Sequence, residues 1–291
     1  MMTRLSSLFV KNLILLNITV LAMFFVGCKE PTGCLTKPYG TKVLAIGNSF
    51  TVGATESFLL PIVNESGNPL FFASAILGNS SLETHWNNLQ ENENVYYFRF
   101  ICEDTIISHE NQSLAHCIEY LDWDYIILQQ LSSNSGTYNS YFPYITNLIN
   151  YIYDHTSNKD VEIGFHQTWA YDQASSHGGF MYYGKNQLVM YDSIRYVAER
   201  VCRELKIKTF IPSGTAIQNA RVTLGDAFCS DGYHINNLGS YIAACTWAET
   251  FFGIDCFELK VVPSTSISDE SLYILRSAAH NACLTPNSVT K

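Results

Sequence analysis

Short apolar runs alternate along the chain with longer segments whose apolar residues recur at helical spacing. Between residues 186 and 205, for example, Leu188, Tyr191, Ile194 and Val197 fall on one face of a helix. The apolar runs predict buried strands over residues 42–47, 69–76, 123–130, 161–167 and 207–212. The amphipathic segments predict helices over residues 53–67, 111–121, 141–153, 186–205, 237–252 and 268–284.

Strands that are apolar throughout and that alternate with helices are typical of a parallel sheet covered on both faces. Because crossovers between parallel strands are right-handed, the pattern predicts a doubly wound, three-layer α/β/α fold of the flavodoxin-like kind. Alternating aromatic residues over 95–101 predict an accessory strand outside the parallel core. In such folds ligands bind beyond the carboxyl ends of the strands.

The first residues predict an export signal. Arg4 and Lys11 lead into an apolar run over 13–26, which ends at Gly27 and Cys28. A basic start, an apolar stretch and small residues before a cleavage point are typical of a secretory signal, and the run is too short and too polar for a membrane span. A cysteine directly after a glycine resembles a bacterial lipobox, in which Cys28 would be lipidated; the alternative is a secreted protein that is cut elsewhere.

These features divide the chain into a lipoprotein-type signal peptide over 1–27, a tether over 28–41 and a single α/β domain over 42–291. We expect the protein to be exported to the cell envelope, where a single lipid would hold it at a membrane without spanning it.

Net charge and cysteine content limit the kinds of ligand and cofactor that we expect this protein to bind. A formal net charge of −9, with no run of Lys or Arg after the signal, argues against nucleic acid, because a phosphate backbone requires a basic surface. Of nine cysteines, eight remain if Cys28 is lipidated, which permits disulfides or buried free thiols. There is no CxxC pair, so we expect neither a metal nor another cofactor.

Ser49 follows the first predicted strand in the stretch "KVLAIGNSF" and therefore lies at the edge of the sheet where ligands bind. Gly47 allows a tight turn there. A serine becomes a strong nucleophile only with a base in reach and a group that orients the base. Otherwise Ser49 is an ordinary helix N-cap.

Asp231 and His234 offer that base and its orienting group. They stand three residues apart in "CSDGYHINNLGSY", just before the helix predicted from 237, on the same edge after the fifth strand. That spacing lets the carboxylate hold the imidazole Nδ1–H while Nε2 faces the serine. Cys229, two residues before Asp231, either forms a disulfide that fixes this loop or simply packs.

The order "GNSF" and then, far downstream, "DGYH" resembles the SGNH/GDSL hydrolase superfamily, and further blocks resemble an uncharacterised exported bacterial branch of it, a domain of unknown function. The resemblance runs from about residue 42 to 252. It implies a nucleophilic Ser49 with Asp231 and His234, and an oxyanion hole made by the N–H groups of Ser49 and Gly78 and by an amide side chain.

Two departures accompany the resemblance. The usual amide block is replaced by "LQQLSSNSG", so either Gln129 or Gln130 would take the amide role, with Gln129 preferred and Gln130 beside the substrate. Asn48 replaces the aspartate that often precedes the nucleophile, and we expect it in the substrate site. For the glutamines, a hydrogen bond to a neighbouring loop is the alternative.

Residues after the fourth predicted strand are further candidates for substrate binding. His166, Trp169 and Tyr171 lie on the same edge, where aromatic rings could stack on a sugar or could equally be core packing.

The sequence therefore favours a serine esterase that hydrolyses a small acyl ester, such as acetyl, on a glycan, without a cofactor. Its partner would be a small acyl ester or an acylated carbohydrate. A non-catalytic glycan-binding lipoprotein with the same fold, and an O-acyltransferase that uses the same acyl-enzyme, remain open.

Overall fold

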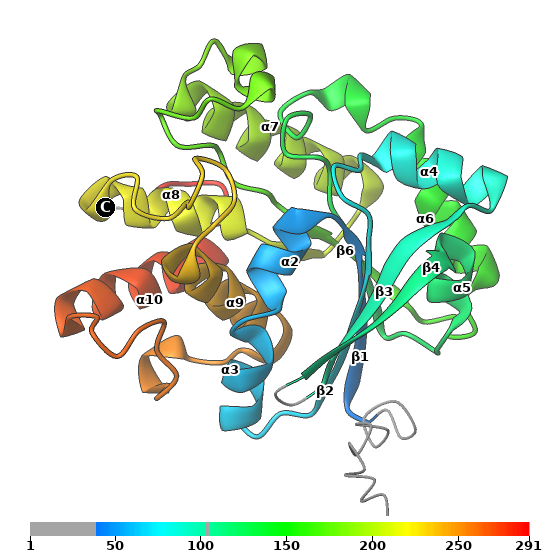
Figure 1. Cartoon of the computed structure of the whole chain (residues 1–291), viewed down its shortest axis with the longest axis horizontal. Coiled ribbons are helices and arrows are strands. Elements are labelled where there is room, and N and C mark those ends of the chain that lie inside the picture. The colour runs from blue at the N-terminus through cyan, green and yellow to red at the C-terminus, as the bar shows by residue number, and fades with distance from the viewer. Residues whose placement is uncertain (1–38, 103–104, 291) are drawn as a thin grey trace, which may run out of the picture.

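The computed structural model describes residues 39–102 and 105–290, which form a sheet of seven strands between layers of helices (Figure 1). The strand order is β4-β3-β2-β1-β5-β6-β7. Five neighbouring strands are parallel: β1 (Thr41–Gly47), β2 (Leu70–Ile76), β5 (Tyr125–Leu128), β6 (Glu162–His166) and β7 (Thr209–Ile211). The predicted doubly wound, flavodoxin-like α/β/α fold is confirmed.

The central strand β1 shows why the parallel strands are apolar throughout. Val43 and Ala45 point into one hydrophobic core, whereas Leu44 and Ile46 point into the other, and all four are buried. Successive side chains of a strand point to opposite faces, so a strand covered on both faces has no polar face to show.

The first core is covered by helices that follow β1 and β7: α2 (Ser49–Thr55), α3 (Leu59–Glu65), α8 (Ser213–Leu224), α9 (Asn237–Phe252) and α10 (Asp269–Leu284). The second is covered by helices that follow β2, β4 and β5: α4 (Leu82–Glu91), α5 (Leu114–Glu119) and α6 (Tyr144–His155). The long helix α7 (Gln187–Leu205) contributes its first half to the first core and its second half to the second. Three short 3-10 helices, η1 (Tyr138–Ser140), η2 (Gly178–Tyr183) and η3 (Cys256–Glu258), complete the elements.

Strand β3 (Asn94–Cys102) pairs antiparallel with β2, as predicted for an accessory strand, and β4 (Thr105–Ser113) extends the sheet by one more antiparallel strand. The sequence did not predict β4, because most of its side chains are polar and exposed and show no apolar alternation. The helix predicted over 111–121 shortens to α5, which begins after Ser113 caps it through the N–H of His116.

The helices differ from the prediction in two further places. The helix predicted over 53–67 is two helices, α2 and α3, and between them Glu56 makes a bidentate ion pair with Arg99 of β3 (2.6 and 2.8 Å). Helix α8 was missed because every residue from 213 to 221 is buried, so its sequence has no polar face and no helical period.

The structure tests the predictions about the cysteines only for the described residues. Among the described residues Cys102 is disulfide-bonded, whereas Cys229 is a free thiol, so it packs rather than staples its loop. The predicted signal peptide, Cys28 and the tether up to residue 38 lie outside the described residues. No helix in the described part of the chain is long and apolar enough to cross a membrane.

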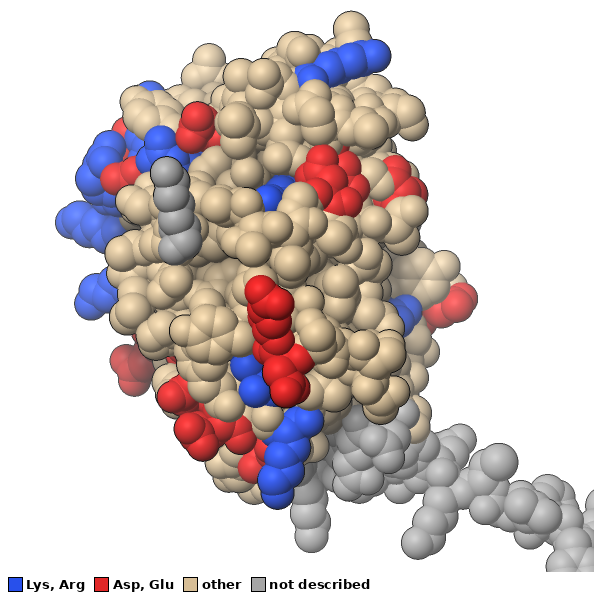
Figure 2. Space-filling view, turned by 90° about the vertical axis from the view of Figure 1, so that its left-hand side faces the viewer, with Lys and Arg blue, Asp and Glu red and all other residues tan. Residues whose placement is uncertain are grey.

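Figure 2 shows acidic and basic side chains scattered among uncharged ones over one face.

Two histidines lie fully buried near the carboxyl edge of the parallel strands. On α4, His85 bonds through Nε2 to the Ser80 hydroxyl (3.0 Å) and through Nδ1 to the Tyr96 hydroxyl (2.9 Å). At the end of β6, His166 bonds to Gln129 and to Ser213 (3.0 Å each). Burial lowers the pKa of both imidazoles to about 3, so both are neutral at physiological pH.

This burial predicts loss of stability in mild acid. In the unfolded chain each histidine takes up a proton below a pKa of about 6.5, whereas in the folded protein it does not until about pH 3. The unfolded state then binds more protons, so the free energy of unfolding falls as pH drops through this window, by about 2 kcal/mol per histidine between pH 7 and pH 5. Urea unfolding at both pH values measures this fall.

The variants His85→Gln and His166→Gln should each lose about half of this histidine contribution to the pH dependence, whatever their stability at pH 7. The exposed His155→Gln is the matched control and should keep all of it. An undiminished dependence in both buried-site variants would contradict the assignment.

Candidate active site

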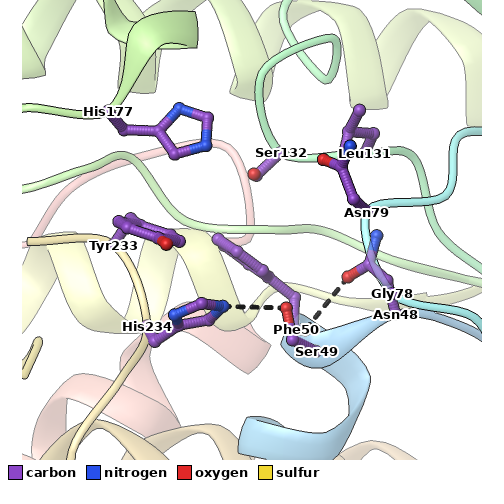
Figure 3. Close-up of a pocket in the computed structure, with 10 residues that line it drawn as sticks. All are labelled: Asn48, Ser49, Phe50, Gly78, Asn79, Leu131, Ser132, His177, Tyr233 and His234. Carbon is purple, nitrogen blue, oxygen red and sulfur yellow. Dashed lines mark hydrogen bonds between the residues drawn. The ribbon is translucent and has the colours of Figure 1, made fainter. Parts of the chain in front are cut away.

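Ser49 is the first residue of α2, directly beyond the end of β1. Asn48 takes the N-cap position, and its Oδ1 accepts a hydrogen bond from the N–H of Phe50 (3.0 Å). Ser49 is therefore not the N-cap, and its hydroxyl is directed to His234 instead (Figure 3). Gly47 is required by close packing, since a Cβ there would lie 2.1 Å from the Thr51 hydroxyl.

Ser49, His234 and Asp231 form a continuous chain of hydrogen bonds. The distance from Ser49 Oγ to His234 Nε2 is 2.9 Å, and that from His234 Nδ1 to Asp231 Oδ2 is 2.7 Å. Because a carboxylate only accepts, Nδ1 carries the proton and Nε2 is free to accept the proton of the serine. Residues 185 positions apart in the sequence thus meet at one edge of the sheet.

The carboxyl of Asp231 is held in its charged form. Desolvation acts to raise its pKa, but hydrogen bonds from the backbone and ring of His234 and from the N–H of Tyr233 outweigh it, so the pKa lies below its ordinary value. Oδ1 accepts from the N–H of His234 (2.7 Å) and of Tyr233 (3.1 Å), which leaves Oδ2 for the imidazole. The loop thereby fixes the carboxylate and the ring together.

A buried arginine anchors the loop that carries this pair. Arg221 of α8, only 6% exposed, bonds Asp172 (2.7 Å) and forms an ion pair with Asp226 (3.0 Å). The N–H of Asp172 then donates to the carbonyl of Gly232 (2.8 Å), between the two triad residues. Arg221 therefore connects α8 to both segments that frame His234.

A pocket of about 420 Å³ opens in front of Ser49, within the range of small-molecule sites, about 300–1,000 Å³. Figure 3 shows the ten residues that line it. They are Asn48, Ser49, Phe50, Gly78, Asn79, Leu131, Ser132, His177, Tyr233 and His234.

Gly78 lies on the wall of this pocket, as expected. A Cβ at this position would meet nothing within 4 Å, so neither packing nor backbone conformation demands a glycine. No described residue accepts a hydrogen bond from its N–H. Gly78 therefore brings an unbonded N–H, and no side chain, to the wall of the pocket.

The amide predicted for the oxyanion hole lies elsewhere. Gln129, 1% exposed, donates from Nε2 to Asn48 Oδ1 (2.7 Å) and accepts at Oε1 from the Thr51 hydroxyl (2.9 Å). Gln129 is outside the pocket lining, and its hydrogen bond holds the side chain of Asn48 in place. Gln130 is also buried: its Oε1 accepts from the N–H of Leu82 (3.1 Å), and its Nε2 donates to Ser140. For both glutamines the alternative, a hydrogen bond to a neighbouring loop, is correct.

The three candidates at the end of β6 and directly after it also pack inside the protein and do not line the pocket. Trp169 and Tyr171 are fully buried, and Trp169 stacks on Phe50 with ring centroids 4.4 Å apart. His166 lies beneath Gln129. The prediction that these side chains contact substrate is therefore wrong, because the chain turns inward after β6.

Several pocket residues were missed by the sequence analysis: Phe50, Asn79, Leu131, Ser132, His177 and Tyr233. One signal was available for Asn79, a residue of the turn after β2 that adopts a left-handed conformation (φ 55°), which asparagine tolerates better than most residues. Tyr233 lies inside the Asp231–His234 motif itself. The pocket lining has no Lys, Arg, Asp or Glu, and no group of described residues is arranged to hold a metal ion.

Comparison with known proteins places the chain in a family. No curated protein matches it. Among solved structures, an acetylxylan esterase from Geobacillus stearothermophilus is 11% identical (TM-score 0.45; 74% of this chain and 96% of that one covered). An alpha/beta hydrolase enzyme from the metagenome of Lake Arreo, Spain, is 12% identical (TM-score 0.45; 74% and 96% covered). Likeness at this level says nothing about activity.

A much stronger match is the crystal structure of a DUF4886 family protein from Bacteroides uniformis ATCC 8492. It is 37% identical, with a TM-score of 0.82 over 86% of this chain and 97% of that one. The family model described as "Domain of unknown function (DUF4886)" matches residues 42–282. The predicted relation to a domain of unknown function is thus confirmed, and this chain belongs to the DUF4886 family.

Proposed function

We propose that this protein is a serine ester hydrolase of the SGNH type. The observation that carries the proposal is the hydrogen-bonded chain from Ser49 through His234 to Asp231, at the mouth of a pocket of small-molecule size. A nucleophile, a base and an orienting carboxylate in this order are the groups that acyl transfer requires.

In the proposed reaction, His234 Nε2 takes the proton of Ser49 as Oγ forms a bond to the carbonyl carbon of an ester. Asp231 stabilises the imidazolium. The tetrahedral intermediate collapses as the bond to the alcohol oxygen breaks and His234 returns the proton to that oxygen. Water, deprotonated by His234, then attacks the acyl-serine, and the acid leaves as Ser49 recovers its proton.

In this proposal two backbone amides stabilise the negative charge on the carbonyl oxygen. Ser49 is at the first position of α2, where an N–H has no acceptor within the helix, and Gly78, whose N–H no described residue accepts, lines the same pocket. Gln129 takes no direct part in this proposal. Through Asn48 it positions the turn from which the Ser49 amide points.

The uncharged lining of the pocket supports a neutral ester with a small acyl group, such as acetyl. We further propose export through the signal over residues 1–27 and anchoring at the cell envelope through a lipid on Cys28. A glycan of the envelope would then be the nearest acylated alcohol.

Replacing the nucleophile is the first test. Ser49→Ala in the full chain should lower kcat for p-nitrophenyl acetate by at least about 10³-fold, because the variant loses the pocket hydroxyl that is bonded to the His234 imidazole. Intact-mass analysis after exposure to a fluorophosphonate should show one adduct on the wild type and none on Ser49→Ala. Asp231→Asn, which leaves the ring in the wrong tautomer, should lower kcat by roughly 10³–10⁴-fold.

Ser193→Ala is the matched control, since this half-buried serine of α7 lies outside the pocket lining and its hydroxyl bonds only to the carbonyl of Val189 in its own helix. It should retain both turnover and labelling. Equal rates for wild type and Ser49→Ala would end the proposal.

A methyl group at residue 78 tests the oxyanion site. Gly78→Ala should lower kcat by about 10²-fold, because the methyl displaces the substrate oxygen from its amide donor. The thermal midpoint should stay near that of the wild type, since the new Cβ meets no protein atom within 4 Å.

The control is Gly178→Ala, an exposed position outside the pocket lining where a Cβ also meets open space. Its activity and melting temperature should both be retained. A fully active Gly78→Ala would remove Gly78 from the oxyanion hole.

A further inference from the structure

Two side chains that the proposed chemistry does not use face Ser49 across the pocket. His177 precedes η2 in the loop after β6, and Tyr233 stands between the triad residues Asp231 and His234. Figure 3 shows both rings directed into the pocket from the side opposite Asn79. Neither side chain takes part in the proton transfers or in the oxyanion contacts proposed above.

The hydrogen-bonding state of His177 is fixed by its own turn. Its Nδ1 accepts a hydrogen bond from the N–H of Gly179 (3.0 Å), so in the neutral ring the proton resides on Nε2. Burial, followed by the nearby His234, lowers the pKa of His177 and keeps the ring neutral. No described residue accepts a hydrogen bond from Nε2. His177 therefore presents one unused donor to the pocket.

Both rings are held in place before any ligand arrives. His177 lies between Tyr171 and Tyr233, with ring centroids at 4.7 and 4.6 Å. Tyr233 in turn lies 4.2 Å from the His234 ring, and its backbone carbonyl accepts from the indole of Trp169 (2.8 Å). A rigid donor beside a rigid aromatic face binds a ligand at little cost in conformational entropy.

The chemistry of the pocket beside His177 and Tyr233 indicates the kind of alcohol that these two residues would bind. No cationic side chain lines the pocket, so a phosphate or carboxylate would find no counter-charge. A plain alkyl chain would leave the donor of His177 unpaired on binding, which costs free energy. An uncharged ring with hydroxyl groups around its rim and apolar C–H groups on its face satisfies both features.

We propose that His177 and Tyr233 form the subsite for the alcohol half of the ester, and that this alcohol is an uncharged sugar ring. The His177 Nε2–H donates to a hydroxyl or acyl oxygen of the sugar, and the ring of Tyr233 packs against its C–H face. The acyl group would then lie at Ser49 and Gly78. The inference rests on the proposed ester hydrolysis for its kinetic test but makes a separate claim about binding.

Two substitutions of His177 separate its two nitrogen atoms. His177→Asn places an oxygen near the position of Nδ1 and keeps the bond to Gly179, but it removes the donor at Nε2. His177→Gln extends an amide N–H toward the position of Nε2. The matched control is His155→Asn, since His155 also stacks on a tyrosine (Tyr151, 3.7 Å) but lies exposed at the end of α6.

The kinetic readout compares two acetate esters in the full-length protein, glucose pentaacetate and p-nitrophenyl acetate, of which only the first has a sugar. The ratio of their kcat/KM values should fall about tenfold in His177→Asn, the loss expected for one hydrogen bond, and recover in part in His177→Gln. It should not change in His155→Asn. An equal loss on both esters in His177→Asn would overturn the subsite, because the residue would then act on a step common to both.

The binding readout does not depend on turnover. Saturation-transfer NMR with methyl β-glucoside should show contact with the wild type and with Tyr233→Phe, which keeps the ring, and reduced contact with Tyr233→Leu and His177→Asn. Hydrolysis of p-nitrophenyl acetate without any contact to methyl β-glucoside would overturn the sugar subsite and leave the hydrolase. Sugar contact that depends on both residues, without hydrolysis of either ester, would support the subsite and overturn the hydrolase.

Discussion

The buried side chain of Asn48 is the interaction on which the candidate site depends. Its Nδ2 donates to the carbonyl of Ser80 (3.0 Å), and its Oδ1 accepts from the N–H of Phe50 and from Gln129. One amide thus connects the ends of β1, β2 and β5, which lie side by side in the sheet. Leaving a buried amide group unpaired costs about 1–3 kcal/mol, so these three ends are fixed relative to one another. Ser49 and the loop from β2 to Ser80, which contains Gly78, are therefore held in a set arrangement.

The histidines beneath this edge are neutral, whereas the ionised groups nearby are Asp231 at the surface and the cluster of the buried Arg221 with two aspartates. His85 and His166 remain unprotonated through burial and link the loops by hydrogen bonds alone. The carboxylate of Asp231, by contrast, is 42% exposed. Neutral dipoles beneath Ser49 hold the surrounding loops in position without placing a net charge there.

The sequence predicted the parallel core and the meeting of Ser49, His234 and Asp231, since both depend on order along the chain. Apolar runs mark strands that are buried on both faces, and any residue that follows such a strand reaches the same edge. The order of residues along the chain does not determine in which direction a side chain points once the strand has ended. Gln129 follows β5 as predicted, yet it points beneath Asn48 and not into the pocket. His177 comes from a short 3-10 turn with no periodic pattern, so only the folded chain brings it opposite Ser49.

The antiparallel extension of the sheet has a consequence for self-association. The outermost strand, β4, exposes polar side chains such as His109 and Glu110, its pairing with β3 is interrupted by register shifts, and Asn111 turns left-handed (φ 55°). At the opposite border, β7 is only three residues long. A long, flat, apolar border would recruit strands from other molecules, and neither border offers one. Crowded copies of this protein would thus lack the template from which fibrils grow.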